Sequence, residues 1–138
     1  PKPGRVNSWK PEINQSVLSD KAETKKLAAG KRPTSGPVPF VLDVRSEKEY
    51  FSKNSFGGGY QAPGINSIHI PWSEFFRNDG RPNLKLRSRL EAVGIRPGSR
   101  IIVLSNQGLR SGAVTMALLS MGYPKAANFA GGFRKLVK

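Results

Sequence analysis

One segment near the end of the chain, residues 100–122, constrains the fold more than any other. It begins with an unbroken run of aliphatic residues, Ile101–Leu104, which is typical of a strand buried on both faces of a parallel sheet. A polar loop follows from Ser105 to Arg110, and the next stretch has the apolar spacing of a helix that ends at Gly122. Strand, tight loop and helix in this order predict that the loop amides converge above the amino end of the helix.

The polar loop has the character of an anion-binding site. N–H groups without helical partners at the amino end of a helix, together with the helix dipole, stabilise negative charge. We expect the side chain of Ser105 to gain most from this field, because it lies first in the loop, where the donors converge. The other residues expected to form the site follow it directly: Asn106, Gln107, Gly108, Leu109, Arg110 and Ser111.

This loop resembles the active-site loop of the rhodanese-like family, in which Cys-x-x-Gly-x-Arg-Ser is a frequent pattern at the end of a central strand. Gly108, Arg110 and Ser111 match that pattern. Ser105 stands where the family has its catalytic cysteine, and the chain contains no cysteine. The resemblance therefore predicts a rhodanese-like loop with oxygen in place of the reactive sulfur.

The resemblance covers roughly residues 38–136 and rests on several motifs in the order that the family has them, which makes it specific for the fold. One departure is Gln61, which falls about where the family usually has a histidine. The motifs outside the loop resemble an Asp-Val-Arg strand end, an Ile-Pro segment and a late Gly-Gly turn. They are residues 41–45 with Glu47 and Tyr50, residues 63–72, and residues 129–133.

The resemblance implies a sulfurtransferase. In the family a thiolate, with its pKa lowered by the loop amides and the helix end, takes sulfane sulfur from a small anionic donor such as thiosulfate and passes it on as a persulfide. By the same resemblance the catalytic positions are Ser105, Arg110, Asp43 and Arg45. A serine hydroxyl cannot form a persulfide, so we expect the chain to be inactive as it stands. No cofactor and no metal site is expected.

Asp43 and Arg45 end a predicted strand, where open α/β sheets place their ligands. From the residues alone, Asp43 either caps the helix near Glu47 or pairs with an arginine, and the resemblance favours contact with Arg110 or the loop amides. His69 is the only histidine, and without partners for catalysis or metal binding it is expected to be a packed or partly exposed strand residue.

Two other functions stay open. The first is a natural, non-catalytic module that uses the same pocket to bind an anion or a protein partner, and the sequence does not decide whether Ser105 is natural or engineered. The second is phosphatase chemistry. Related dual-specificity phosphatases have five residues between nucleophile and arginine, whereas four separate Ser105 from Arg110, so this function ranks low.

The chain is strongly basic, with a formal net charge of +14 over 138 residues. Such a surface attracts anions, small or polymeric, and it also favours solubility. No RNP-like alternation of aromatic and basic residues is present, so nucleic acid is not expected as a partner. No apolar run approaches the roughly 20 residues that cross a bilayer, and the sequence leaves the compartment open.

The predicted fold is α/β and rhodanese-like, with a central, mostly parallel sheet and helices on both faces. We expect an N-terminal arm at residues 1–15 and one domain at residues 16–138. Core positions are expected at Leu86, Leu90 and Val93 of one helix and at Val114, Met116, Ala117, Leu118 and Met121 of another. Strands are predicted at residues 17–18, 38–44, 65–71, 101–104 and 126–129. Helices are predicted at residues 20–29, after an N-cap at Ser73, at 84–93, after the loop to Gly122, and as a closing turn at 133–138.

Overall fold

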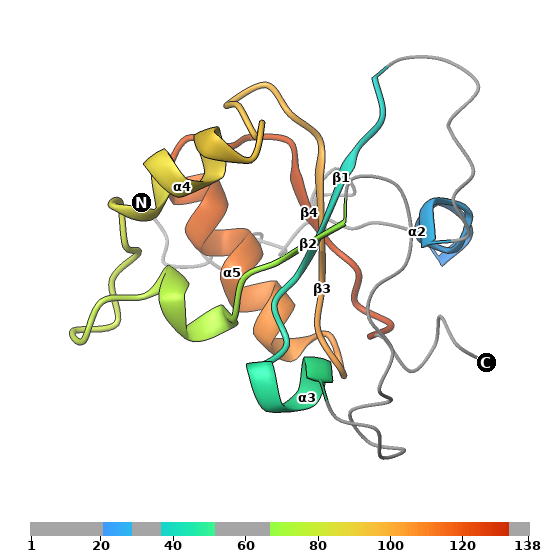
Figure 1. The fold of residues 1–138 in the computed structure, drawn as a ribbon, viewed down its shortest axis with the longest axis horizontal. Coiled ribbons are helices and arrows are strands. Elements are labelled where there is room, and N and C mark those ends of the chain that lie inside the picture. The colour runs from blue at the N-terminus through green and yellow to red at the C-terminus, as the bar shows by residue number, and fades with distance from the viewer. Residues whose placement is uncertain (1–20, 29–36, 52–66, 133–138) are drawn as a thin grey trace, which may run out of the picture.

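A four-stranded, all-parallel sheet forms the centre of the molecule (Figure 1). The computed structural model describes residues 21–28, 37–51 and 67–132. The strands lie in the order β2-β1-β3-β4, and Val41 lies opposite Ile102 in the central pair. Their bounds are β1 Phe40–Asp43, β2 Ser67–His69, β3 Ile101–Leu104 and β4 Ala126–Asn128.

Helices cover both faces of this sheet, as predicted. Helix α2 (Lys21–Ala28) lies on one side in Figure 1, and α5 lies on the other with α4 and the 3₁₀ helix η2. Leu27 of α2 packs with Val41 and Ile102, whereas Leu90 and Val114 pack with Leu42 on the opposite face. The bounds on that face are η2 Trp72–Phe75, α4 Leu86–Ala92 and α5 Leu109–Ser120.

The central strand β3 is fully buried on both of its faces. Ile101 and Val103 point into the cluster under α4 and α5, and Ile102 and Leu104 point into the cluster that contains Leu27. All four side chains have zero exposure. A strand with two apolar faces needs apolar residues at every position, which is why the sequence shows an unbroken run here.

The strand order has a topological switch point between β1 and β3, where the chain stops adding strands on one side of β1 and continues on the other side. From β1 the chain moves to β2 on one side, and β3 lies on the other side of β1. In open α/β sheets ligands bind in the crevice outside the carboxyl ends of the strands at such a point. Short helix α3 (Glu47–Phe51) follows β1 there, and the loop before α5 follows β3. The fold therefore brings the two predicted site segments to one place.

Several predicted elements differ in extent. The strand predicted at 38–44 shortens to Phe40–Asp43, the strand predicted at 65–71 ends at His69, and the helix predicted at 84–93 begins at Leu86. Residues 65–66 lie outside the described residues. Ser73 is not an N-cap, because η2 already begins at Trp72. Its N-cap position is occupied by Pro71, which makes no side-chain capping bond. The predicted arm, the strand at 17–18 and the closing turn lie outside the described residues.

Two predicted core residues are exposed. Val93 is the C-cap of α4, past the last helical turn, so it does not continue the stripe of Leu86 and Leu90. Met116 lies on the outer side of α5, whereas Val114, Ala117, Leu118 and Met121 are buried as predicted. Within the described ranges no helix is long and apolar enough to span a membrane.

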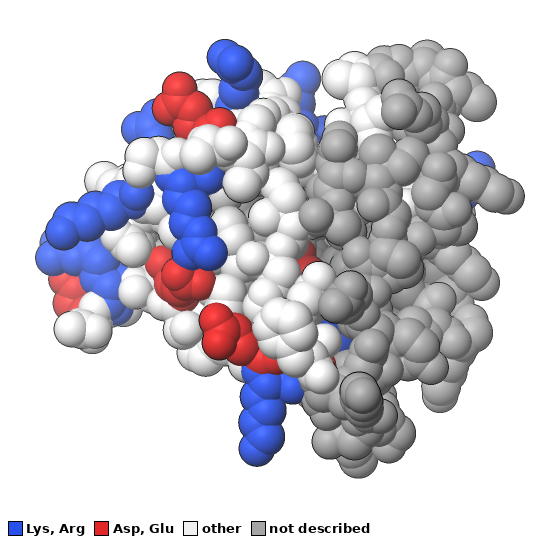
Figure 2. Space-filling view, viewed as in Figure 1, with Lys and Arg blue, Asp and Glu red and all other residues white. Residues whose placement is uncertain are grey.

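Basic side chains project from the surface of α4 and the segment before it. Figure 2 shows blue atoms gathered over this side of the molecule, and Lys85, Arg87 and Arg89 are exposed there. Glu74 of η2 forms an ion pair with Arg89. The basic side chains of α4 and its N-cap residue Lys85 therefore form a solvated face.

Candidate functional site

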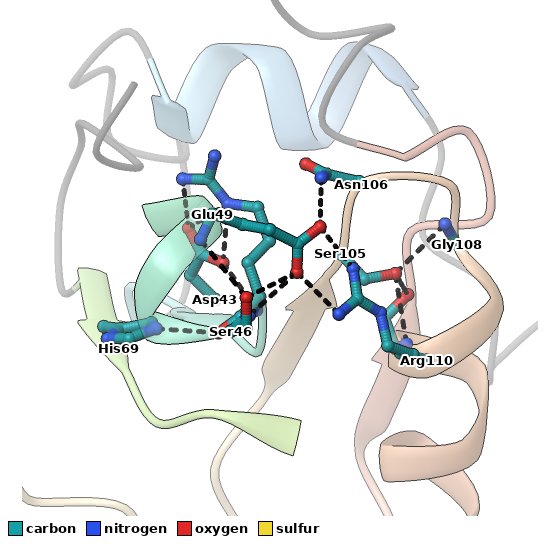
Figure 3. Close-up of polar contacts among 10 residues, drawn as sticks. Asp43, Ser46, Glu49, His69, Ser105, Asn106, Gly108 and Arg110 are labelled. Carbon is teal, nitrogen blue, oxygen red and sulfur yellow. Dashed lines mark hydrogen bonds and ion pairs between the residues drawn. The ribbon is translucent and has the colours of Figure 1, made fainter. Parts of the chain in front are cut away.

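Two backbone amides, one at the end of the loop and one in the first turn of α5, converge on the hydroxyl of Ser105, the residue directly after β3. Its Oγ accepts the backbone N–H of Gly108 at 3.0 Å and of Ser111 at 3.1 Å, and its own hydrogen is donated to Ser111 Oγ at 2.9 Å (Figure 3). Ser105 has zero exposure. The loop thus curls around a single side-chain oxygen at the amino end of α5, a helix of 12 residues.

The curl depends on Gly108, which has φ +86° and immediately precedes α5. A Cβ atom there would lie 2.3 Å from the carbonyl oxygen of Ala130. The same restriction applies to Gly132, where an added Cβ atom would lie 2.3 Å from the carbonyl oxygen of Asn106. The loop and the turn after β4 therefore pack backbone against backbone, and only glycine fits at the two contact points.

Side-chain bonds fasten the loop to its surroundings. Asn128, at the end of β4, donates from Nδ2 to the carbonyl oxygen of Gly108 at 3.2 Å. Thr115 Oγ1 donates to the carbonyl oxygen of Ser111 at 2.7 Å, one turn into α5. These bonds hold the backbone at Gly108 and Ser111, the two residues whose N–H groups point at Ser105, so the direction of the converging amides is fixed by the fold.

The predicted loop residues divide into three groups. Ser105, Gly108 and Ser111 meet, as described above. Asn106 and Arg110 turn toward α3, and Arg110 lies in the first turn of α5 because the helix begins at Leu109, earlier than predicted. Gln107 and Leu109 are exposed, Leu109 to 78%.

Asp43 and Arg45 form a buried ion pair with each other. Arg45 Nη2 lies 2.8 Å from Asp43 Oδ2, and Nε lies 3.1 Å from both carboxylate oxygens. Exposure is zero for Arg45 and 1% for Asp43. The expectation that Asp43 contacts Arg110 or the loop amides is wrong, and pairing with an arginine is right. The pair forms locally, because only Val44 separates the two residues and the backbone N–H of Arg45 also bonds Asp43 Oδ1 at 3.1 Å.

Arg110 instead binds Glu49 of α3, which we did not single out in the sequence. Arg110 Nη1 lies 2.6 Å from Glu49 Oε1, and Nη2 lies 2.6 Å from Oε2. The side chain of Asn106 donates to the same Oε2 atom. Figure 3 shows the carboxylate of Glu49 between the loop and the start of α3.

Glu49 is also one half of a capping box at the start of α3. Ser46 Oγ accepts the N–H of Glu49 at 3.2 Å, and Glu49 Oε1 accepts the N–H of Ser46 at 3.0 Å and its hydroxyl at 2.9 Å. The Ser-x-x-Glu spacing of this motif is visible in the sequence and would have identified the local bond. It carries no information on the bond to Arg110.

These contacts stabilise the charged form of Glu49. Its pKa falls from 4.5 to about 2, chiefly because Arg110 donates to the carboxylate, with the bonds from Ser46 adding to the effect and burial opposing it. Near neutral pH, Glu49 is therefore fully ionised and its charge offsets that of Arg110.

The family profile of the rhodanese-like domain matches residues 20–138, most of the chain. The chain belongs to the rhodanese-like domain family. The sequence pattern predicted this membership, and the described α/β fold agrees with it. No curated protein matches the sequence.

Solved structures with the same fold are distant in sequence. This rhodanese-like domain is 18% identical to EanB in two complexes with a TM-score of 0.66, covering 87% of this chain and 29% of that one. One contains a cysteine-to-serine variant with hercynine, and the other has ergothioneine covalently linked with a cysteine persulfide. SseA from Escherichia coli, a 3-mercaptopyruvate sulfotransferase, is 15% identical with a TM-score of 0.66, covering 91% of this chain and 45% of that one. The domain thus spans less than half of either protein, and the likeness shows the fold alone.

The chemistry open to this rhodanese-like domain is limited at Ser105. The partners of its hydroxyl are two amide donors and a second hydroxyl, and none of these accepts a proton strongly enough to act as a general base. His69, half-buried, lies elsewhere: it stacks on Tyr50 at 3.9 Å, with Nε2 2.8 Å from the carbonyl oxygen of Arg45. Among the described residues no cluster of three metal-ligating side chains exists.

Proposed function

We propose that this chain is a rhodanese-like sulfurtransferase domain in which Ser105 occupies the place of the sulfur-carrying cysteine. In its present form it binds a small anion at the loop and transfers no sulfur. One observation carries the proposal: the N–H groups of Gly108 and Ser111 converge on Ser105 Oγ at the amino end of α5.

The same arrangement would activate a thiol. Two N–H donors and the positive end of a helix favour negative charge on the atom that they surround, which lowers the pKa of a cysteine below its usual value of about 8.5. A serine oxygen in that place receives the same bonds but cannot carry sulfane sulfur. We therefore expect no thiocyanate from thiosulfate and cyanide with the present sequence.

The proposed donor is thiosulfate or a related small anion, and the acceptor a thiophile. The persulfide in EanB and the sulfotransferase activity of SseA show that proteins sharing this fold carry sulfur chemistry. Arg110, 31% exposed at the start of α5, is the cation that we assign to the donor. We assign no donor-binding role to Arg45, since it is buried against Asp43.

The test is Ser105→Cys treated with thiosulfate and followed by intact mass. The thiolate attacks the sulfane sulfur, one S–S bond forms, another breaks and sulfite leaves with the electron pair, so the protein gains one sulfur. Cyanide then takes the outer sulfur as thiocyanate and restores the thiolate. Because the chain has no cysteine, Ser120→Cys is a matched control with a single thiol at the far end of α5. The control should gain no sulfur.

A non-catalytic module that binds an anion or a protein is the second candidate. Full burial of Ser105, with bonds on both its donor and its acceptor sides, favours this function, because a hydroxyl enclosed in this way serves a structural role and is not presented to a substrate. If the Ser105→Cys thiol can be alkylated but never gains sulfur, this candidate takes first place. Sequencing the source DNA at codon 105 shows whether the serine is natural.

A further inference from the structure

The anion that Arg110 would bind is replaced by a side chain of the protein itself. A guanidinium held by both oxygens of a carboxylate makes the same two-pronged contact that it makes to a bound sulfate or phosphate. In this structure Glu49 makes that contact at 2.6 Å to each nitrogen, and it also accepts from Asn106 of the loop (Figure 3). The rim of the site is therefore occupied by an internal carboxylate.

The second arginine at this end of the sheet is neutralised in the same manner. Arg45 is paired with Asp43, 2.8 Å away and fully buried. Each of the two arginines that the sequence assigns to the site thus has its own carboxylate, and the ion pairs leave little net positive charge from these side chains. The electrostatic binding free energy that a small dianion gains from these side chains is therefore smaller than two arginines without their carboxylates would provide.

We propose that Glu49 is an internal carboxylate ligand of Arg110 that sets the selectivity of the loop against small dianions. The inference rests on the proposed anion site at this loop. An incoming dianion must displace the carboxylate from Arg110, while Glu49 keeps its capping bonds to Ser46. Glu49 thus lowers the affinity for dianions and is a specificity-determining residue.

The experiment compares Glu49→Gln with Glu47→Gln. Both variants raise the net charge by one and lie in α3, but Glu47 is exposed and outside this network. Glutamine at position 49 can still accept the N–H of Ser46, so the capping box is kept. Sulfate is titrated into the ¹⁵N-labelled proteins, with the amides of Gly108 and Ser111 and the Arg110 Nε–H as reporters. Glu49→Asp, whose carboxylate is one methylene too short to reach Arg110 as well, is the second variant.

Glu49→Gln is expected to bind sulfate about three- to tenfold more tightly than the unmodified protein, with shifts at the loop reporters. Glu49→Asp should give a smaller gain, and Glu47→Gln less than twofold. Equal gains for Glu47→Gln and Glu49→Gln, or no gain at the loop for Glu49→Gln and Glu49→Asp, overturn the inference. Sulfur gain by Ser105→Cys is measured separately from sulfate binding. The sulfurtransferase proposal fails if that variant gains no sulfur, whereas the present inference fails on the sulfate titrations.

Discussion

The guanidinium of Arg110 binds both carboxylate oxygens of Glu49 across 61 residues of sequence. This ion pair joins α3, which follows β1, to α5, which follows β3. The two strands are already paired in the sheet, and the side-chain bond connects the segments that follow their carboxyl ends. Loop geometry and the position of α3 are therefore linked through a single carboxylate.

Acid is expected to weaken this link. The pKa of Glu49 is about 2 in the folded chain, against an ordinary value of 4.5 that applies once the chain unfolds, so ionised Glu49 stabilises the fold fully above the ordinary value. That contribution is lost as the pH falls from about 4.5 toward 2. Urea unfolding of the unmodified protein and Glu49→Gln at pH 6, 4.5 and 3 measures it. The stability difference between them should shrink over this range, and a constant difference would contradict the assigned ion pair.

Gly108→Ala is expected to destabilise the domain much more than Gly80→Ala. Both glycines have a positive φ, +86° and +83°, so the backbone strain of about 1 kcal/mol is shared. At Gly108 the new methyl meets the Ala130 carbonyl at 2.3 Å, whereas at Gly80 nothing lies within 4 Å. We expect about 2–4 kcal/mol for Gly108→Ala and about 1 kcal/mol for Gly80→Ala, measured by urea unfolding. Equal losses would mean that the loop and the turn after β4 are not in contact.

Because β3 is buried on both faces, its first and last residues could be predicted correctly from the sequence. Ile101–Leu104 has no polar position, so its pattern has only one interpretation once length is considered. The edge strand β2 ends at His69, where its pairing with β1 stops opposite Asp43. Propensity at residues 65–71 could not show where that pairing stops. Met116 was misassigned because an apolar residue on a helix is not necessarily on its buried face.

The parts of the site that depend on chain neighbours were also predictable. Ser105, Gly108 and Ser111 are close in sequence, and a tight turn before a helix brings them together. The bond between Glu49 and Arg110 depends on how two separate βα units dock, which neither periodicity nor spacing encodes. For the same reason the sequence left Asp43 with several possible roles: a cap of the helix near Glu47, a pair with an arginine, or contact with Arg110 or the loop amides. The pair with an arginine is correct, and the partner is Arg45, two residues away.

The buried pair at the end of β1 gives the last prediction. Asp43→Ala leaves the guanidinium of Arg45 at zero exposure without the carboxylate that binds it through Nε and Nη2. Breaking such a pair from one side costs about 3–5 kcal/mol, because the remaining charge stays buried. Urea unfolding of Asp43→Ala is the measurement, and Asp79→Ala is its matched control.

Asp79 makes the corresponding pair on the surface, with Arg77 at 3.3 Å, where the two side chains are 45% and 58% exposed. Water replaces a lost carboxylate there, so Asp79→Ala should cost no more than about 1 kcal/mol. Asp43→Asn should fall between the two, because the amide oxygen still accepts from Arg45 while the charge is lost. Similar costs for Asp43→Ala and Asp79→Ala would mean that water reaches Arg45. The crevice beyond β1 and β3 would then be open to solvent, and Arg45 would return as a candidate for binding the anionic donor.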